Sequence, residues 1–462
     1  MFDPKVYQSR RNSLRSKFKN GILLFPGNME TAMNYKANTY HFRQDSCFLY
    51  YFGLNQPDLF GIIDIDKGED SIFGNDIDIE DIIWMGNLPS IAERASLAGV
   101  TKTLPLANLA TFLQHPDNKK RPIHFLNPYR GETIVQLQAL LDKNPVQLKE
   151  NSSKELAIVI AQMRSIKEDR EIVEIEKVVD VAGIMHTTAM RMAMPGIIER
   201  EIAGIIEGIA LSKGAGVSFP IIATMHGETL HNHHHGNSLK QNDLLIIDAG
   251  AESELGYASD ITRTSPVGGT FTPQQKEIYE LVLAANLAAI EMAKPGIFYK
   301  DVHLKAATVI AEGLKAIGLM KGNIQEAVQQ GAHALFFPHG LGHMMGLDVH
   351  DMENIGENYV GYDNTIARSS QFGLAYLRLG KKLETGNVIT DEPGIYFIPA
   401  LIDLWQAEKK FTEFINYDAL KAYRNFGGIR LEDDLLITNT GCRVLGKPIP
   451  KTVKEVEAIV GK

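Results

Sequence analysis

HGLGHMMGLDVHD, residues 339 to 351, is the stretch from which we interpret the rest of the chain. Its histidines, His339, His343 and His350, stand among glycines, where the backbone and a bound group can approach each other closely. Apolar runs that end at a carboxylate, or lie beside one, occur on both sides of it. We therefore expect the rest of the chain to be organised around this stretch.

Four carboxylates accompany the stretch. Asp248 lies upstream in LLIIDAG and Asp260 in SDITRT, while Glu392 lies downstream in VITDEPGIY and Glu432 in GGIRLEDD. With one histidine they form the ligand set of a carboxylate-rich site for two metal ions. Carboxylates this near each other in an apolar sheet would repel unless a cation neutralised them. The pattern predicts a metallohydrolase.

The two upstream carboxylates are expected on neighbouring strands. LLIIDAG reads as a buried strand that ends at Asp248, and SDITRT as a second strand that starts at Asp260, so both side chains can point at one place. Two divalent ions about 3.5 to 4 Å apart would share a water or hydroxide with a pKa lowered from about 15.7 toward about 7, the expected nucleophile. Because hard oxygen ligands dominate and no cysteine takes part, we expect Mn2+, with Co2+ or Zn2+ as alternatives.

The composition is that of an ordinary globular protein. The 462 residues exceed what one core usually organises, so we expect two domains, 1–158 and 159–462. A net charge of −9 without a basic cluster argues against nucleic acid as a partner. There are two cysteines, no signal-peptide core and no run of about 18 apolar residues, which predicts a cytoplasmic enzyme without a membrane partner.

Residues 1–158 alternate short apolar runs with helical patterns, which predicts a smaller α/β domain. Strands are expected at GILLFP (21–26), CFLYYFG (47–53), LFGIIDI (59–65) and IIWMG (82–86), and helices at SIAERASLAG (90–99) and ETIVQLQALLDK (132–143). DIDIED (76–81) alternates acidic residues with isoleucine, which favours a half-exposed edge strand. No ligand set occurs here, so this domain is expected to shape substrate access or assembly.

Residues 159–462 begin with a helical pattern. Ser165 followed by Glu168 has the form of a capping box. Apolar residues then recur at helical spacing: Ile172, Ile175, Val179, Ala182 and Met185. This helix must end before Pro195, and a second helix is expected to stop at Gly214.

An internal repeat follows. MAMPGI (192–197) recurs as MAKPGI (292–297), and each copy ends one helix and precedes another. The helix before the second copy has a start signal in Thr272, Pro273 and Gln275. The repeat predicts two related α+β halves that face each other, with the metal site between them.

The order Asp, Asp, His, Glu, Glu within DAGAE, YASDITRT, HGLGHMMGLDVHD, DEPGIY and GIRLEDD resembles the aminopeptidase P and prolidase branch of the pita-bread metallopeptidases. The resemblance covers nearly the whole chain. It implies an α+β protein with a C-terminal pita-bread catalytic domain and an N-terminal domain of aminopeptidase P type. It also implies a homodimeric exopeptidase for peptides with proline in the second position, either an Xaa-Pro aminopeptidase or an Xaa-Pro dipeptidase.

The resemblance implies a role for each metal ligand. Asp248 would bind one ion, Asp260 and Glu432 would bridge both, and His343 and Glu392 would complete the second. Glu392 would also be the proton shuttle.

The resemblance extends to the substrate-binding groups. His231 and His350 match the outer histidines that hydrogen-bond the substrate and the oxyanion, and His339 matches a histidine near the scissile bond. Arg378, fourteen residues before Glu392, resembles the prolidase arginine that holds the substrate's C-terminal carboxylate, with a surface arginine as the alternative. Arg430 is expected to orient the site.

Three segments depart from the pattern or add to it. Asp248 and Asp260 are twelve residues apart where many relatives have eleven, and we expect a bulge in the hairpin to absorb the extra residue. HNHHHG (231–236) is read as a polar turn in which only His231 matches the family. The stretch 403–426 resembles an insertion of eukaryotic-type prolidases and is expected to wall the substrate pocket.

Two other functional classes compete with the peptidase hypothesis. A non-catalytic pita-bread binding protein is disfavoured because all five ligand positions are filled. A metal-dependent hydrolase of phosphoesters is weakened by the absence of a phosphate-cradling glycine loop. Metal-based catalysis also suits a bond to proline, because that tertiary amide has no N–H for a protease to hold.

Overall fold

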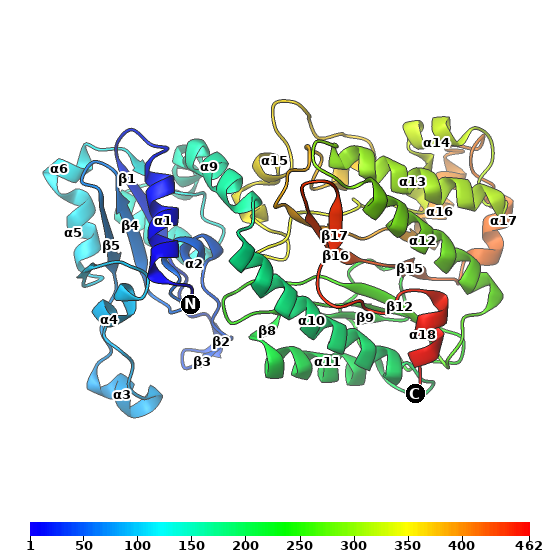
Figure 1. The fold of residues 1–462 in the computed structure, drawn as a ribbon, viewed down its shortest axis with the longest axis horizontal. Helices are drawn as coiled ribbons and strands as arrows, with labels where there is room; N and C mark the ends of the chain where they lie inside the picture. The colour runs from blue at the N-terminus through cyan, green and yellow to red at the C-terminus, as the bar shows by residue number, and fades with distance from the viewer. The chain divides into compact units, whose positions relative to one another are not determined.

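The computed structural model describes residues 1–462 as two compact units of mixed helices and strands (Figure 1). The first comprises Met1–Met163 with Asn354–Gly356, and the second comprises Arg164–Glu353 and Glu357–Lys462. None of the helices combines the length and the apolar composition that crossing a bilayer requires. The domain boundary after residue 158 stays a prediction, because a compact unit is not by itself an independently folding domain.

A five-stranded sheet forms the centre of the first unit. Its order is β6-β5-β4-β1-β7, with antiparallel pairs in the middle and a parallel pair at each edge. The strands are β1 (Ile22–Pro26), β4 (Phe60–Asp64), β5 (Glu69–Phe73), β6 (Lys102–Leu104) and β7 (Ile123–His124). Alternate residues of a strand point to the same face of the sheet. Such residues, among them Leu24 and Ile62, pack with Phe73 in one buried cluster.

Helices and a short hairpin complete the first unit. They are α1 (Pro4–Arg15), α2 (Ser46–Phe52), α3 (Ile79–Met85), α4 (Ile91–Ser96), α5 (Asn108–Gln114), α6 (Pro116–Lys119), α7 (Gly131–Leu141), α8 (Pro145–Asn151), β2 (Ala32–Tyr35) and β3 (Asn38–Thr39). Helix α9 (Lys154–Ser165) begins in the first unit, and its last two residues belong to the second. The buried leucines of α5, α7 and α8 belong to the same core cluster as the sheet.

The apolar run 47–53, which we expected to be a strand, lies in helix α2. The Asp45 carboxylate caps this helix by accepting a hydrogen bond from the Phe48 amide, and Gly53 ends it in the left-handed conformation. All seven residues of α2 are buried. The prediction was wrong because a run that is apolar on every side carries no period that separates helix from strand.

The segment 76–86 contains a helix, α3 (Ile79–Met85), in place of the two strands that we predicted. Helix α3 begins at a capping box in which Asp78 accepts from the Asp81 amide and Asp81 accepts from the Asp78 amide. The alternation of acidic residues with isoleucine is therefore the start signal of a helix. None of the residues of α3 is buried, so no packed sheet face imposes an extended conformation on them.

Two helix pairs cover the second unit. They are α10 (Asp169–Met192) with α11 (Glu199–Lys213), and α12 (Pro273–Met292) with α13 (Tyr299–Ala316). The predicted capping box of Thr272 and Gln275 is present. The predicted cap at Ser165 is wrong, because Ser165 is the last residue of α9 and Glu168 caps α10 with Glu171 as its partner.

The two copies of the repeated motif adopt the same local structure. Gly196 and Gly296 have φ values of 92° and 85°, in the left-handed region that glycine tolerates best. Their amides donate to the carbonyls of Leu239 and Leu383, each at 2.8 Å. Each motif is followed by a helix, α11 or α13, so the similarity extends from six residues to the surrounding backbone.

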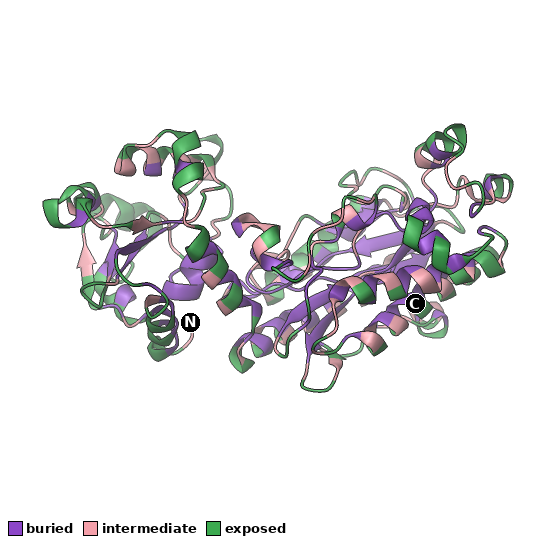
Figure 2. Cartoon of the chain, turned by 90° about the horizontal axis from the view of Figure 1, so that it is seen from above, coloured by how far each residue is buried: buried purple, intermediate pink, exposed green.

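Short strands, most of them buried, lie inside the second unit, whereas the helices turn exposed faces outward (Figure 2). The strands are β8 (Gly216–Val217), β9 (Ile222–Thr224), β10 (Leu244–Asp248), β11 (Ala251–Glu252), β12 (Thr262–Pro266), β13 (Val388–Asp391), β14 (Gly394–Tyr396), β15 (Gly428–Arg430), β16 (Asp433–Ile437) and β17 (Cys442–Val444). The remaining helices are α14 (Ile324–Gln330), α15 (Glu357–Val360), α16 (Pro399–Ala407), α17 (Tyr417–Leu420) and α18 (Val453–Ile459).

Candidate active site

The two upstream carboxylates lie on one hairpin. Asp248 is the last residue of β10 and pairs with Thr262, the first residue of β12, while Asp260 precedes β12 by two residues. The Asp434 carboxylate accepts a hydrogen bond from the Asp260 amide at 3.0 Å. The predicted strands therefore place Asp248 and Asp260 at the same end of a buried sheet.

The hairpin contains no bulge, contrary to our expectation. The pairs Asp248–Thr262 and Glu252–Ala258 keep a single register, and the Ser253 amide donates to the Tyr257 carbonyl at 2.8 Å. Any additional residue therefore lies in the turn at the tip. A turn absorbs one more residue more easily than a paired ladder does, because no partner strand fixes its length.

The stretch 339–351 runs beside β13. The His343 amide donates to Thr390 Oγ1 at 3.1 Å, and the Thr390 amide donates to the His343 carbonyl at 3.0 Å. A Cβ on Gly342 would lie 2.2 Å from the Thr390 carbonyl oxygen, so the close approach requires glycine. His343 Nδ1 lies 2.9 Å from the Met344 carbonyl, which leaves Nε2 as the free ligand atom.

The downstream glutamates reach the same place from two other strands. Glu392 follows β13, and its amide donates to the Leu341 carbonyl at 2.8 Å. Glu432 lies between β15 and β16, and its side chain accepts a hydrogen bond from Thr262 Oγ1 at 2.7 Å.

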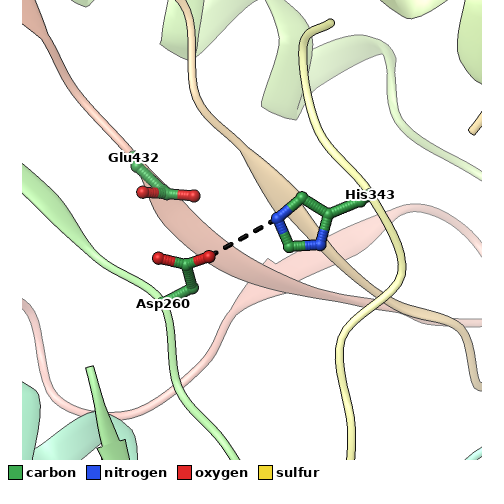
Figure 3. Close-up of side chains that lie close together, drawn as sticks. All are labelled: Asp260, His343 and Glu432. Carbon is green, nitrogen blue, oxygen red and sulfur yellow. Dashed lines mark ion pairs between the residues drawn. The ribbon is translucent and has the colours of Figure 1, made fainter. Parts of the chain in front are cut away.

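Three of these side chains form a group that could hold a metal ion. Ligand atoms of Asp260, His343 and Glu432 all lie within 4.8 Å of one another, and all three residues are buried (Figure 3). His343 Nε2 is 3.4 Å from Asp260 Oδ2 and 3.8 Å from Glu392 Oε1. Asp248 Oδ1 is buried without a hydrogen-bond partner.

The negative charges of the carboxylates in this group are poorly neutralised by the surrounding residues. Burial, and then the neighbouring carboxylates, raise the pKa of Asp260 and of Glu432 well above their ordinary values. Burial likewise raises the pKa of Glu392 to about 7. A divalent cation would remove the repulsion between these carboxylates and would give Asp248 Oδ1 a partner, so the donor set fits a metal centre.

Arg430 forms hydrogen bonds that hold residues of the candidate metal centre in place. Its guanidinium donates to Asp248 Oδ2 at 2.7 Å, to Tyr396 Oη at 2.9 Å and to Thr262 Oγ1 at 3.2 Å. The side chain is only 4% exposed, so its contacts orient the ligands, although it also borders the cavity described below. Thr262 and Tyr396 had no predicted role, but Tyr396 lies inside the DEPGIY motif, four residues after Glu392.

The three predicted non-ligand histidines differ in their partners. His339 Nε2 lies 2.8 Å from Tyr396 Oη, and burial followed by the charge of Arg430 lowers the pKa of His339 to about 3. Burial also lowers the pKa of His231. His350 Nδ1 lies 2.6 Å from Glu353 Oε2, and its ring centroid is 4.1 Å from that of His343. The histidines in this group therefore include at least one neutral imidazole, His339.

Arg378 is not an isolated surface arginine. Its Nε lies 3.3 Å from Glu353 and 3.6 Å from Glu357, and about a third of its side chain is exposed.

One cavity of about 780 Å³ collects all of these groups. Its lining includes every predicted site residue: His231, Asp248, Asp260, His339, His343, His350, Arg378, Glu392, Arg430 and Glu432. His233 and an apolar wall with Phe372 and Leu404 also line it, which the sequence did not reveal. Of the stretch 403–426, only Leu404, on helix α16, is part of the lining.

A buried cluster of carboxylates and one histidine in a cavity of this size defines a metal-dependent hydrolase. The model of metallopeptidase family M24 matches residues 173–439, and the model of the aminopeptidase P N-terminal domain matches residues 7–124. The chain belongs to metallopeptidase family M24 and is a metal-dependent peptidase.

Curated relatives and solved structures cover nearly the whole chain. Human Xaa-Pro dipeptidase is 31% identical over 95% of this chain and 88% of its own length. A probable Xaa-Pro aminopeptidase of Aspergillus niger is 31% identical over 96% of this chain and 93% of its own. Aminopeptidase P from E. coli, solved with the inhibitor Pro-Leu, superimposes with a TM-score of 0.80 at 28% identity, over 99% of this chain and 98% of its own. These likenesses confirm the predicted fold class.

Proposed function

We propose that this peptidase hydrolyses the bond between an N-terminal residue and a proline in the second position. The observation that carries the proposal is the convergence of the five predicted ligands in one cavity. The relatives of the chain include proteins named Xaa-Pro dipeptidase and Xaa-Pro aminopeptidase, which supports proline specificity. The predominantly apolar wall of the cavity also suits a proline ring.

We infer that Asp248, Asp260, His343, Glu392 and Glu432 hold two divalent ions. The oxygen-rich donor set favours Mn2+, and Co2+ or Zn2+ can occupy the same ligands. Bound there, the ions would supply Lewis-acid polarisation of the scissile carbonyl and an activated water as the nucleophile. Asp260 and Glu432 would serve both ions in this proposal.

The side chains around the ions handle protons and orientation. Glu392 carries a proton to the leaving proline nitrogen, because its carboxylate lines the cavity beside the proposed metal ligands. His231 and His350 hydrogen-bond and orient the substrate, and His231 donates to the developing oxyanion. Arg430 holds Asp248, and the contact of its partner Tyr396 with His339 connects it to another residue of the cavity lining.

The first experiment measures hydrolysis of Ala-Pro and Ala-Pro-Ala by chelated protein, before and after Mn2+ is added back. We expect activity only with the metal, and its loss in Asp260→Asn. Asp418→Asn, on an exposed carboxylate paired with Lys421, is the matched control and keeps full activity. Cleavage of both peptides means an aminopeptidase, and cleavage of the dipeptide alone means a dipeptidase. If neither peptide is cut in the presence of metal, the proposal is wrong.

Assembly and location complete the proposal. We propose a homodimer, in line with the family resemblance, and sedimentation that shows a monomer at micromolar concentration would contradict it. A cytoplasmic location suits a chain with only two cysteines, Cys47 and Cys442, and cell fractionation tests it.

A further inference from the structure

Glu353 contacts two polar groups of the cavity at once. Its Oε2 atom lies 2.6 Å from His350 Nδ1 and 3.3 Å from Arg378 Nε. Glu353 follows the stretch 339–351 by two residues, and no motif identified above includes it. A single carboxylate oxygen therefore joins the histidine and the arginine that line the cavity.

This contact determines which nitrogen of His350 carries the hydrogen. The hydrogen bond from His350 holds the pKa of Glu353 at about 2, so the carboxylate is ionised and only accepts hydrogen bonds. The hydrogen must then sit on Nδ1, which leaves Nε2 as the nitrogen for partners in the cavity. The same bond restrains the ring, whose centroid lies 4.1 Å from that of His343.

The contact also changes what Arg378 can attract. Its guanidinium has two carboxylate neighbours, Glu353 at 3.3 Å and Glu357 at 3.6 Å, and Glu357 also pairs with Arg368. A substrate carboxylate that approached Arg378 would have to compete with both. An arginine with compensated charge binds an anion less strongly than a free one, because the field that it presents to the cavity is reduced.

We propose that Glu353 is a positioning residue that fixes the Nδ1–H tautomer of His350 and, together with Glu357, limits the affinity of Arg378 for the carboxylate end of a dipeptide. The part that concerns the dipeptide rests on the proposed function. Glu353 thereby influences both the catalytic step and the preference between short and longer peptides.

Kinetics of two charge-removing variants separate these effects. Glu353→Gln keeps the size of the side chain, and we expect it to lower kcat at least tenfold on Ala-Pro and on Ala-Pro-Ala amide. It should also lower KM for Ala-Pro, but not for the amide, which has no carboxylate. Glu357→Gln removes charge beside Arg378 without touching His350, so it should lower KM for Ala-Pro at unchanged kcat. Equal changes of kcat in both variants, or a change below twofold in Glu353→Gln, overturn the proposal.

Glu353→Asp is the conservative variant. It keeps the carboxylate on a shorter side chain and should recover part of the kcat that Glu353→Gln loses. The Glu353 side chain is more than a third exposed, so both variants are expected to fold.

A spectroscopic test does not depend on turnover. Protein labelled with 15N-histidine and free of paramagnetic metal is compared with His350→Gln, which identifies the His350 signals. We expect the Nδ1–H form in the wild type and a shift toward the Nε2–H form in Glu353→Gln. An Nε2–H form in the wild type refutes the tautomer assignment, and unchanged signals in the variant refute the role of Glu353 in fixing the tautomer. If the wild type cuts neither peptide, the proposed function fails while this spectrum still decides the role of Glu353.

Discussion

Asp351, the last residue of the motif HGLGHMMGLDVHD, is buried between two cations, and its replacement by asparagine should destabilise the second unit. Its Oδ1 atom lies 2.6 Å from Arg164 and its Oδ2 atom lies 2.8 Å from Lys167. The three side chains are at most 2% exposed. Asp351→Asn keeps the shape of the side chain but leaves two buried cations without this anion.

The expected loss of stability is large. Removal of one partner from a buried ion pair costs about 3 to 5 kcal/mol. The second unit contains about 300 residues, for which an unfolding entropy of about 0.6 kcal/mol/K is typical, so Tm should fall by about 5 to 8 °C. Asp348 also pairs with Arg164, at 3.0 Å, but it is 32% exposed. Asp348→Asn should therefore cost below about 1 kcal/mol, or about 2 °C.

The assay is calorimetry of both variants and the wild type at one scan rate, at pH 7 and at low pH. Burial alone would raise the pKa of Asp351, but Lys167 and Arg164 lower it overall. A lowered carboxyl pKa stabilises the fold above the unfolded-state pKa of about 3.9, and this contribution disappears as the pH falls through the folded-state pKa. The gap between wild type and Asp351→Asn should therefore narrow below about pH 4. Equal Tm values for Asp351→Asn and Asp348→Asn at pH 7 would refute the reasoning.

Three further predictions concern the active site. Removal of the metal should lower Tm more at pH 8 than at pH 5. The carboxyl pKa values of the metal-free fold are raised, with that of Glu392 at about 7, so this fold loses stability as the pH rises above the pKa values of the unfolded chain. An equal loss of Tm at both pH values would contradict this. Tyr396→Phe leaves Arg430 and His339 each without one hydrogen bond and should reduce kcat about tenfold, as steady-state kinetics would show, while Tyr376→Phe in the same cavity wall should have little effect. Leu404→Ala should raise KM about three- to tenfold for Leu-Pro relative to Ala-Pro at unchanged Tm, since this half-exposed side chain contributes apolar contact to a substrate more than to the core; equal KM changes for both peptides would exclude the role.

Several local features of the fold could be predicted from the sequence because their signals act within a few residues. The capping box at Thr272, the end of α10 before Pro195 and the two Pro-Gly motifs depend on neighbouring backbone groups. The strand ending at Asp248 was readable because its apolar run has the length of a strand and stops at a polar residue.

One error arose where burial decides the local structure, and the other where a local capping signal outweighs an alternating pattern. Residues 47–53 are apolar on every side, and only the burial of all the residues of α2 makes the helix the favoured conformation. The segment 76–86 looked like a strand, but Asp78 and Asp81 satisfy each other's amides and begin a helix. In both cases the apolar pattern was compatible with two periods.

The sequence by itself determined which residue types form the candidate metal-binding set, because a carboxylate and an imidazole retain their ligand chemistry wherever the chain places them. Only the tertiary structure decided that Thr262 holds both Glu432 and Arg430, that Glu353 joins His350 to Arg378, and that an apolar wall lines the cavity. These relations connect segments up to 170 residues apart. They depend on distances that only the folded backbone sets, so no local pattern contains them.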